Sequence, residues 1–333
     1  NVGSAASEDG ATLVSLAIDG GVPYVAYLDR KITVRKYVGE QWTSVGREDV
    51  AQSEGSIFHF AFQVKNGIPY VSYVDRDDDR VHVMRMNGND WEDMGEVDEA
   101  YSEFTNLFVD GDNIPYVAYY EQAESESESE SNAVVVKRWN EQNRAWEMVG
   151  DPMEGSYPDA GFSLFVSEGT PYLAYADTEN EGRVAVKHWS GRQWESVGEL
   201  GISAGRSNMM LLRIDDGVPY AAFTDESYQD RVLVKRFDGD RWTIVGDAAH
   251  HANLNDGLFS FEVSGGTPYL SYADASYDDR GVVTAALSTD NRLSGLGLSA
   301  GALSPDFDPA TKSYTVDVPN EVASLSIAPT AAA

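Results

Sequence analysis

The sequence predicts an all-β chain, in which a six-bladed β-propeller over residues 1–288 precedes part of a β-sandwich over 289–333. Three observations lead to this fold class. A Gly-x-Pro-Tyr stretch occurs six times (with Asn for Gly in the third copy), each copy opens an alternating pattern, and the copies lie 46 to 56 residues apart. Short strands at a repeat of about 40–50 residues are typical of propeller blades. The repeated prolines are Pro23, Pro69, Pro115, Pro171, Pro219 and Pro268.

Each repeat predicts four strands, which together form one blade. In the fourth copy these strands are residues 162–166, 172–177, 183–189 and 194–198, separated by Gly-containing or polar turns. Glycine accepts the positive φ of a tight turn, and proline suits the first residue of a strand because it donates no hydrogen bond. Large and small side chains then alternate, which is the period of a strand.

Two columns of the repeat are expected to be structural. The small column, such as Ala26 and Ser72, predicts a place where a neighbouring sheet packs too closely for a larger side chain. A tyrosine follows the proline in all six copies, and a ligand contact would hardly be identical at six positions around a ring. We therefore expect packed rings with hydrogen-bonded hydroxyls. The tyrosines are Tyr24, Tyr70, Tyr116, Tyr172, Tyr220 and Tyr269.

The first strand of each repeat is expected to border the central channel. Its apolar positions alternate with a mixed column, in which Arg213 and Glu262 fall in adjacent repeats. These two side chains predict an ion pair between neighbouring blades, with a structural role.

The fourth strand carries a tryptophan, followed three residues later by Val or Met and then Gly. The sixth repeat lacks this strand, whereas the chain opens with Asn1-Val2-Gly3, which matches Ser44-Val45-Gly46. We therefore expect the N-terminus to supply the outer strand of the sixth blade near Val283, which removes an open edge. Seven blades is the alternative, if a further blade precedes Asn1. The tryptophans are Trp42, Trp91, Trp146, Trp194 and Trp242.

Composition excludes several classes of function. The chain holds 24 Lys and Arg against 55 Asp and Glu, a net charge of −31, which repels nucleic acids and anionic membranes. It has no cysteine, which excludes disulfides, thiolate catalysis and Cys-ligated zinc. No apolar run approaches the roughly 20 residues of a membrane span, so membrane insertion is not expected.

Two stretches resemble known families. The run Leu293-Ser294-Gly295-Leu296 through Pro305, with Phe307 and Tyr314 beyond it, resembles the start of a bacterial cadherin-like β-sandwich domain. About three strands remain before the chain ends, too few to close a sandwich. We therefore expect a domain that is truncated, disordered beyond this point, or completed by another chain in a homo-oligomer or filament. The Gly-x-Pro-Tyr repeats look like the blade repeats of secreted bacterial surface proteins. Both resemblances imply an extracellular or cell-surface location.

The predicted ligand site lies on the face that holds the loops between the second and third strands and between successive blades. These loops differ between blades, and variable loops are where specificity arises. Aromatic rings there could stack on sugars, while nearby carboxylates and amides bind hydroxyls. The candidates are Tyr101, Tyr157, Tyr228, His250, His251 and Tyr277.

An acidic residue closes the second strand of every repeat, and an arginine stands near the start of the third strand in five of them. The simplest interpretation is a pairing of the two side chains across each hairpin. The alternative is a ring of carboxylates that binds Ca²⁺, which requires six to eight converging oxygens. The candidate ligands are Asp29, Asp75, Asp177, Asp225 and Asp274.

These patterns favour an extracellular, non-enzymatic binding or adhesion module, whose partner is a glycan or a surface protein. One alternative is a structural subunit of an extracellular assembly or surface layer. Another is a polysaccharide hydrolase or lyase, because a glycosidase needs only two suitably placed carboxylates and the chain has 55 acidic residues.

Overall fold

The computed structural model describes residues 6–7, 10–51, 57–98, 101–102, 104–121, 132–156, 161–246, 259–274, 281–286, 293–308, 311, 314–319, 321–322 and 324–331. The described chain is all-β apart from two single 3₁₀ turns, η1 (Thr178–Asn180) and η2 (Glu226–Tyr228). None of its helices has the length and apolar character that a bilayer crossing requires. The predicted position of Val2, and the candidates Tyr157, His250, His251 and Tyr277, lie outside the described residues.

Six antiparallel sheets follow one another along the described chain. The first two contain β1 (Leu13–Asp19), β2 (Val22–Asp29), β3 (Lys31–Val38) and β4 (Gln41–Ser44), then β5 (Ile57–Lys65), β6 (Ile68–Asp75), β7 (Arg80–Asn87) and β8 (Asp90–Asp93). The third contains β9 (Thr105–Val109), β10 (Pro115–Glu121), β11 (Ala133–Asn140) and β12 (Ala145–Met148), with β13 (Met153–Glu154) also paired to β11.

The remaining three sheets repeat the same strand order. The fourth contains β14 (Ser163–Ser167), β15 (Thr170–Asp177), β16 (Arg183–Trp189) and β17 (Trp194–Ser196). The fifth contains β18 (Met210–Asp215), β19 (Val218–Asp225), β20 (Arg231–Phe237) and β21 (Trp242–Ile244). In the sixth, the described residues form three strands, β22 (Phe259–Ser264), β23 (Thr267–Asp274) and β24 (Gly281–Ala286).

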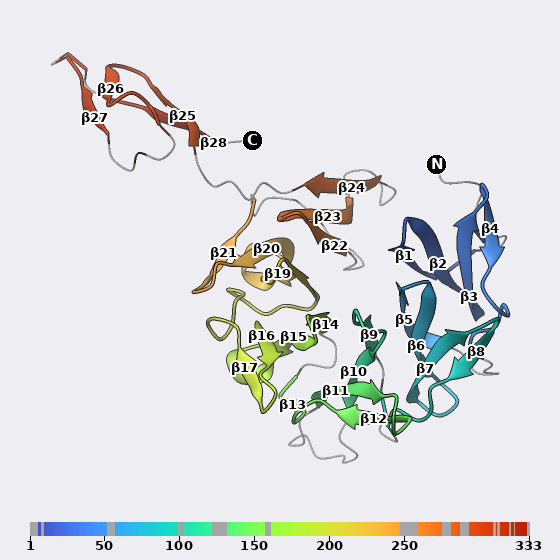
Figure 1. The fold of residues 1–333 in the computed structure, drawn as a ribbon. Coiled ribbons are helices and arrows are strands. Elements are labelled where there is room, and N and C mark those ends of the chain that lie inside the picture. The colour runs from blue at the N-terminus through green and yellow to red at the C-terminus, as the bar shows by residue number, and fades with distance from the viewer. Residues whose placement is uncertain are drawn as a thin grey trace.

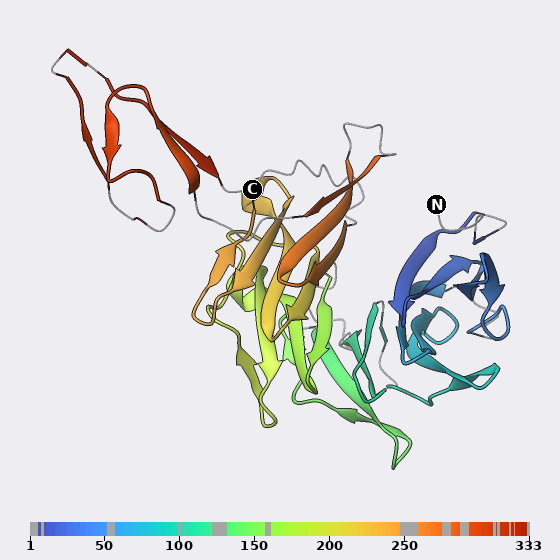
Figure 2. The same ribbon diagram turned by 45° about the horizontal axis from the view of Figure 1, so that its top comes forward.

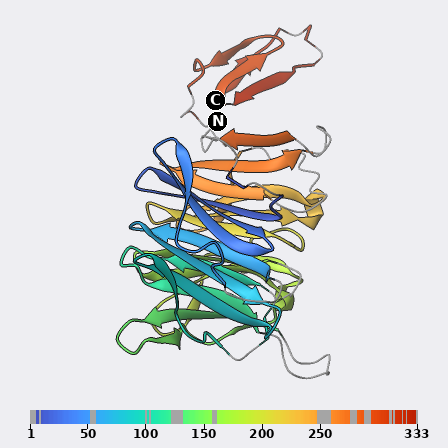
Figure 3. The ribbon, with the colours of Figure 1, turned by 90° about the vertical axis from the view of Figure 1, so that its right-hand side faces the viewer.

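The sheets are arranged around a common centre, with the first strand of each sheet innermost (Figure 1), and Figure 3 shows the same arrangement from the side. Successive first strands contact one another from β1 through β5, β9, β14 and β18 to β22. The prediction of an all-β chain built from repeated four-stranded units is therefore confirmed, and its arrangement is propeller-like. The C-terminal part lies outside the ring (Figures 1 and 2). It pairs β25 (Leu293–Leu298) with β28 (Ile327–Ala331), and β26 (Ala302–Ser304) with β27 (Thr315–Asp317).

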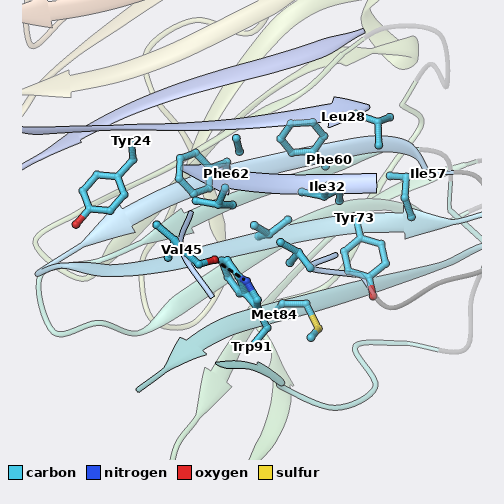
Figure 4. Close-up of a cluster of buried hydrophobic side chains, with 14 residues drawn as sticks. Tyr24, Leu28, Ile32, Val45, Ile57, Phe60, Phe62, Tyr73, Met84 and Trp91 are labelled. Atoms are coloured by element: carbon cyan, nitrogen blue, oxygen red, sulfur yellow. Dashed lines mark hydrogen bonds between the residues drawn. The ribbon is translucent and has the colours of Figure 1, made fainter. Parts of the chain in front are cut away.

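Apolar side chains from neighbouring sheets meet to form the core. Ile32 and Val34 of the first sheet pack with Phe60 and Phe62 of the second, and all four are buried (Figure 4). The small column sits within these contacts, where Ala26 has no exposed surface. Its equivalents Ser72, Ala118, Ala174 and Ala222 are also fully buried. The close approach that the sequence predicts at this column is thus confirmed in the first five sheets.

In the second, fourth and fifth sheets, a tryptophan of the outer strand contacts the Val-Gly dipeptide of the sheet before it. Trp91 Nε1 donates to the Val45 carbonyl at 3.3 Å (Figure 4), and Gly46 lies against the same indole. Equivalent hydrogen bonds run from Trp194 to Val149 at 3.0 Å and from Trp242 to Val197 at 2.7 Å. The recurring Val-Gly dipeptide therefore accepts the indole hydrogen bond of the following sheet and lets the ring pack against its glycine.

The predicted role of the tyrosine column holds where hydroxyl contacts are seen. Tyr70 and Tyr220 are buried, and each donates to a backbone carbonyl in the turn that opens the next repeat, Asn113 and Gly266 respectively, at 3.4 Å. Tyr269 in the sixth sheet is the exception, because 41% of its surface is exposed.

The predicted ion pair between adjacent sheets is confirmed. Arg213 Nε lies 3.0 Å from Glu262 Oε2, and an Nη of the same guanidinium donates to the Leu212 carbonyl. The pair joins the fifth and sixth sheets near their innermost strands. Glu262 is largely exposed, so the pair orients the two strands more than it stabilises them.

Adding a methyl group at Gly150 tests the tryptophan–glycine contact. Gly150 and Gly169 share a positive φ of 74° and 75°, but a Cβ at Gly150 would stand 2.7 Å from Trp194 Nε1, whereas open space surrounds Gly169. Both Ala variants pay about 1–2 kcal/mol for the backbone conformation. Gly150→Ala is expected to lose a further 1–3 kcal/mol or so through overpacking, measured by urea unfolding. Equal losses in the two variants would contradict the contact.

His59 in β5 predicts a loss of stability in acid. Its Nδ1 is buried and has no partner in the described part of the chain, although part of the residue stays exposed, and burial lowers the pKa of the imidazole to about 4. The unfolded chain binds this proton below about pH 6.5, so the free energy of unfolding should fall by up to about 3 kcal/mol between pH 6.5 and 4. His59→Gln should remove this dependence, while His188→Gln should keep it. Identical pH profiles for the two variants would refute the assignment.

Candidate functional site

The aspartates at the ends of the second strands bind backbone N–H groups. Asp225 has no exposed surface and accepts from the backbone nitrogens of Ala204, Gly205 and Ser227 at 2.8, 3.0 and 3.0 Å. Asp75 and Asp177 each accept at 3.0 Å from the nitrogen two residues on. These carboxylates stabilise the loops that follow them, in the manner of Asx turns and N-caps.

The strand register places the two remaining metal candidates. Asp29 closes β2 opposite Lys31, and Asp274 closes β23 opposite Gly281. Among the described residues, no group of three or more His, Asp and Glu side chains is placed to hold a metal ion. The Ca²⁺ site therefore stays a prediction from the sequence.

The predicted aspartate–arginine pairing is right in register but not in contact. Asp75, Asp177 and Asp225 lie directly opposite Arg80, Arg183 and Arg231 on the neighbouring strands. The guanidinium groups bind elsewhere, however. Arg80 pairs with Glu96 at 2.6 Å, Arg183 with Glu181 at 3.0 Å, and Arg231 donates to Gln229 at 3.3 Å. The aspartates do not pair with the opposite arginines because their carboxylates accept hydrogen bonds from backbone nitrogens of the loops.

The two described aromatic candidates stand on separate sheets. Tyr101 is half-buried and precedes β9 of the third sheet. Tyr228 is 38% exposed and lies in η2, after β19 of the fifth sheet. The loops that carry them therefore belong to blades that are not neighbours in the ring.

A pocket of about 580 Å³ opens instead between the second and third sheets, at the opposite end of the strands from the predicted loops. It lies beside the turn between the first and second strands of the third sheet and the turn between its third and fourth strands. The side chains that give it its chemistry are Tyr70, Arg85, Asn113, Trp139, Asn140 and Glu141.

Arg85 holds the two sides of the pocket together. One Nη lies 3.1 Å from Glu92 Oε2 in its own sheet, and the other lies 3.2 Å from Glu141 Oε2 in the third sheet. Arg144, also in the third sheet, reaches back to the second Glu92 oxygen at 2.8 Å. The two sheets thus exchange charged side chains at the pocket rim, and hydrogen bonds from Arg144 and Arg85 lower the pKa of Glu92.

Hydrogen bonds within the third sheet fix the acceptors of the pocket. Trp139 Nε1 donates to Glu141 Oε2 at 2.5 Å, and Asn140 Nδ2 donates to Glu147 Oε1 at 2.6 Å. The indole hydrogen bond, together with Arg85, lowers the pKa of Glu141. Glu141 is therefore an ionised acceptor at neutral pH, and its side chain remains largely exposed to incoming groups.

The pocket combines a buried aromatic floor with both donors and acceptors. Tyr70 and Trp139 form the floor and are only 1 and 5% exposed, whereas Arg85 supplies N–H groups and the largely exposed Glu141 supplies a carboxylate. A pocket of this composition can bind the hydroxyl groups of a small molecule. A molecule with apolar faces and many hydroxyls matches it.

Sequence reasoning missed this pocket because it is shared between two repeats and lies on the other face. The pairing of the second and third strands contains one signal that could have pointed to this end of the sheets. In the first five sheets a basic residue on the third strand lies directly opposite the tyrosine of the second strand. The opposing pairs are Tyr24 with Lys36, Tyr70 with Arg85, Tyr116 with Arg138, Tyr172 with His188, and Tyr220 with Arg236.

No protein-family model matches the chain, and no curated protein matches it in sequence. Solved structures match its fold. The SapL1 lectin in complex with alpha methyl fucoside is 14% identical, with a TM-score of 0.58 over 83% of this chain and 92% of the lectin. A mutant Aleuria aurantia lectin in complex with alpha-methyl-L-fucoside is 12% identical, with a TM-score of 0.53 over 82% of this chain and 93% of the lectin.

An enzyme has a similar fold. Trypanosoma rangeli sialidase is 12% identical, with a TM-score of 0.51 over 78% of this chain and 51% of the sialidase. The chain therefore shares its propeller-like fold with lectins and with a glycosidase. Sequence identities this low support a similarity of fold only.

Removing the Asp225 carboxylate tests whether these aspartates have a structural role. Asp225→Ala leaves three backbone N–H groups without their charged acceptor, whereas Asp177→Ala removes one such hydrogen bond. We expect Asp225→Ala to lower the free energy of unfolding by about 3 kcal/mol or more, and Asp177→Ala by about 1 kcal/mol. Urea unfolding measures both losses, and a smaller loss for Asp225→Ala than for Asp177→Ala would overturn the assignment.

Proposed function

We propose that this protein is a non-enzymatic glycan-binding module, which binds its sugar in the pocket between the second and third sheets. The observation that carries the proposal is the meeting of Tyr70 and Trp139 with Arg85, Asn140 and Glu141 in one cavity. The lectins with a similar fold support it, since both were solved with a methyl fucoside bound.

The charges of the pocket favour a neutral sugar. Arg85 is already paired with Glu92 and Glu141, so it offers hydrogen bonds without an unbalanced positive charge. A net charge of −31 on the chain further opposes anionic glycans. The hydroxyls of the sugar bind the Asn140 amide and the Glu141 carboxylate.

The same carboxylates argue against hydrolysis at this pocket. A glycosidase needs one carboxylic acid that stays protonated until it donates to the leaving group. Hydrogen bonds lower the pKa of both Glu92 and Glu141, which keeps both ionised at neutral pH. The pocket therefore suits binding better than catalysis.

The module is a six-bladed propeller whose ring is closed by the N-terminal strand, and it works outside the cell or on its surface. The six successive sheets around one centre support this assignment of blades. Residues 289–333 then form the start of a sandwich domain that spaces or joins copies of the protein. The secreted character of the resembling repeats supports the extracellular location.

Two substitutions in the pocket test the proposal. A glycan array, with and without EDTA, selects a neutral ligand, and calorimetry then compares the variants. Asn140→Ala and Glu141→Gln should each weaken binding about tenfold, because each removes one hydrogen-bonding group. Glu195→Gln, an exposed glutamate on the fourth sheet, is the matched control and should bind as the parent does.

Two results would contradict the glycan proposal. One is the absence of binding at millimolar concentrations of every neutral sugar tested. The other is equal affinity of the pocket variants and the control. Release of reducing ends from a polysaccharide would favour the hydrolase instead.

A further inference from the structure

The turn between the third and fourth strands is two residues longer in the third sheet than in the first, second, fourth and fifth. Trp139 pairs with Trp146 across this turn, whereas Trp189 pairs with Trp194 across the equivalent turn of the fourth sheet. Each of the four shorter turns has a glycine at its second position, with φ between 60 and 100°. Glu141 stands at that position in the third sheet. The glycines are Gly39, Gly88, Gly191 and Gly239.

Glu141 gives the third sheet a contact that a glycine cannot make. One of its carboxylate oxygens lies 3.2 Å from an Nη of Arg85 in the sheet before it. The basic residues equivalent to Arg85 are Lys36, Arg138 and His188, and the sheet that follows each of them has glycine at the second position of the turn. Among the four interfaces whose turns the structure describes, this one alone has a carboxylate at that place.

Polar side chains of the shorter turns bond within the turn itself. In the fourth sheet, Ser190 Oγ donates to the Gln193 carbonyl at 2.8 Å. In the fifth sheet, Asp238 Oδ1 accepts from the backbone nitrogens of Asp240 and Arg241 at 3.0 and 2.9 Å. These groups stabilise their own hairpins, whereas the carboxylate of the longer turn reaches the sheet before it.

The aromatic pair beside the longer turn is placed differently from its counterpart. Trp139 and Trp146 meet with ring centroids 5.4 Å apart and planes at 63°, much as the equivalent pair of the fourth sheet does at 5.8 Å and 60°. Both rings of that pair lie against Gly150, whereas no described residue lies against Gly95. Trp139 Nε1 donates to Glu141 at 2.5 Å, and Trp146 Nε1 is buried with no partner in the described chain. The pair is therefore intact, but it is bound to the turn and not packed on the glycine.

We propose that the longer turn decides which interface of the chain binds the sugar, and that the chain has one such site. Glu141 binds both Trp139 and Arg85 at the rim, which keeps the aromatic pair off Gly95 and the pocket open. With a shorter turn, the pair packs on the glycine as it does in the fourth sheet, and the interface closes. The third sheet thus gives up one packing contact and gains a binding site.

The single sugar site rests on the proposed glycan binding, whereas the effect of the turn on packing does not. Affinity and stoichiometry therefore test the site, and a melting temperature measured without ligand tests the packing.

Exchange of the turn tests both. Replacing residues 140–145 with Ser-Gly-Arg-Gln, the sequence of residues 190–193, gives the third sheet the turn of the fourth. The variant should lose affinity for the neutral sugar selected on the glycan array by about a hundredfold, because two hydrogen-bonding side chains are removed together. Calorimetry measures the loss, and circular dichroism checks that the variant is folded. Unchanged affinity in a folded variant would overturn the proposal.

Gly95→Ala measures the packing without a ligand. In the parent, no described residue lies within reach of the added methyl group. After the turn exchange the aromatic pair lies on this glycine, so Gly95→Ala should lower the melting temperature by roughly a further 2–6 °C. Gly169→Ala, at a similar φ of 75° and likewise uncrowded, is the matched control and should have the same effect in both backgrounds. If Gly95→Ala also has equal effects in the two backgrounds, the turn does not keep the rings off the glycine and the proposal is wrong.

The number of sugars bound is the third measurement. Calorimetry of the parent should give one sugar per chain. A stoichiometry above one would show that another interface with the same tyrosine and basic residue binds, which would overturn the single site. If no neutral sugar binds the parent, the glycan proposal and the single sugar site fail together. The melting temperatures of the Gly95→Ala variants then still decide whether the turn holds the interface open.

Discussion

The propeller-like arrangement depends on packing between sheets, because a single sheet of this repeat leaves both of its apolar faces uncovered. Ala26, Ser72 and their equivalents carry almost no side chain at the point of contact, which lets the larger residues of the next sheet enter. A tryptophan then spans the outer edge and bonds to the backbone beside a glycine. Stability therefore comes from neighbours in the ring, as in other repeat architectures, and each repeat carries half of two interfaces.

That arrangement explains where the sequence was informative. The Gly-x-Pro-Tyr period identifies the strands, and the conservation of Tyr70 and its equivalents within the chain indicates packing, because identical sites around a ring share identical surroundings. The Arg213–Glu262 pair could be predicted because both residues hold equivalent places in adjacent repeats. In each case, comparison of the repeats with one another identified the equivalent positions, which a single copy could not have done.

The pocket could not be found in the same way, because its chemistry depends on what differs between repeats. Arg85 finds a carboxylate partner in the third sheet because Glu141 falls in a turn that is longer there. The sequence pointed instead to the aspartates on the opposite face. Those carboxylates already accept hydrogen bonds from backbone N–H groups, and Asp225 has no exposed surface. A list of acidic residues does not reveal which carboxylates are already occupied.

The interface that contains the pocket is built differently from the others. Among the described residues, the buried indole nitrogen of Trp146 in the third sheet has no hydrogen-bond partner and nothing lies against Gly95 of the second sheet, whereas Gly46, Gly150 and Gly198 each lie against a ring of the next sheet. Charged side chains around Arg85 join the two sheets at this edge, outside the buried apolar cluster that they share. Exposed ion pairs weaken with salt, whereas buried aromatic contacts do not. A ligand bound between these two sheets would add contacts across an interface that lacks the tryptophan–glycine contact. Ligand binding would therefore also strengthen the attachment of the second sheet to the third.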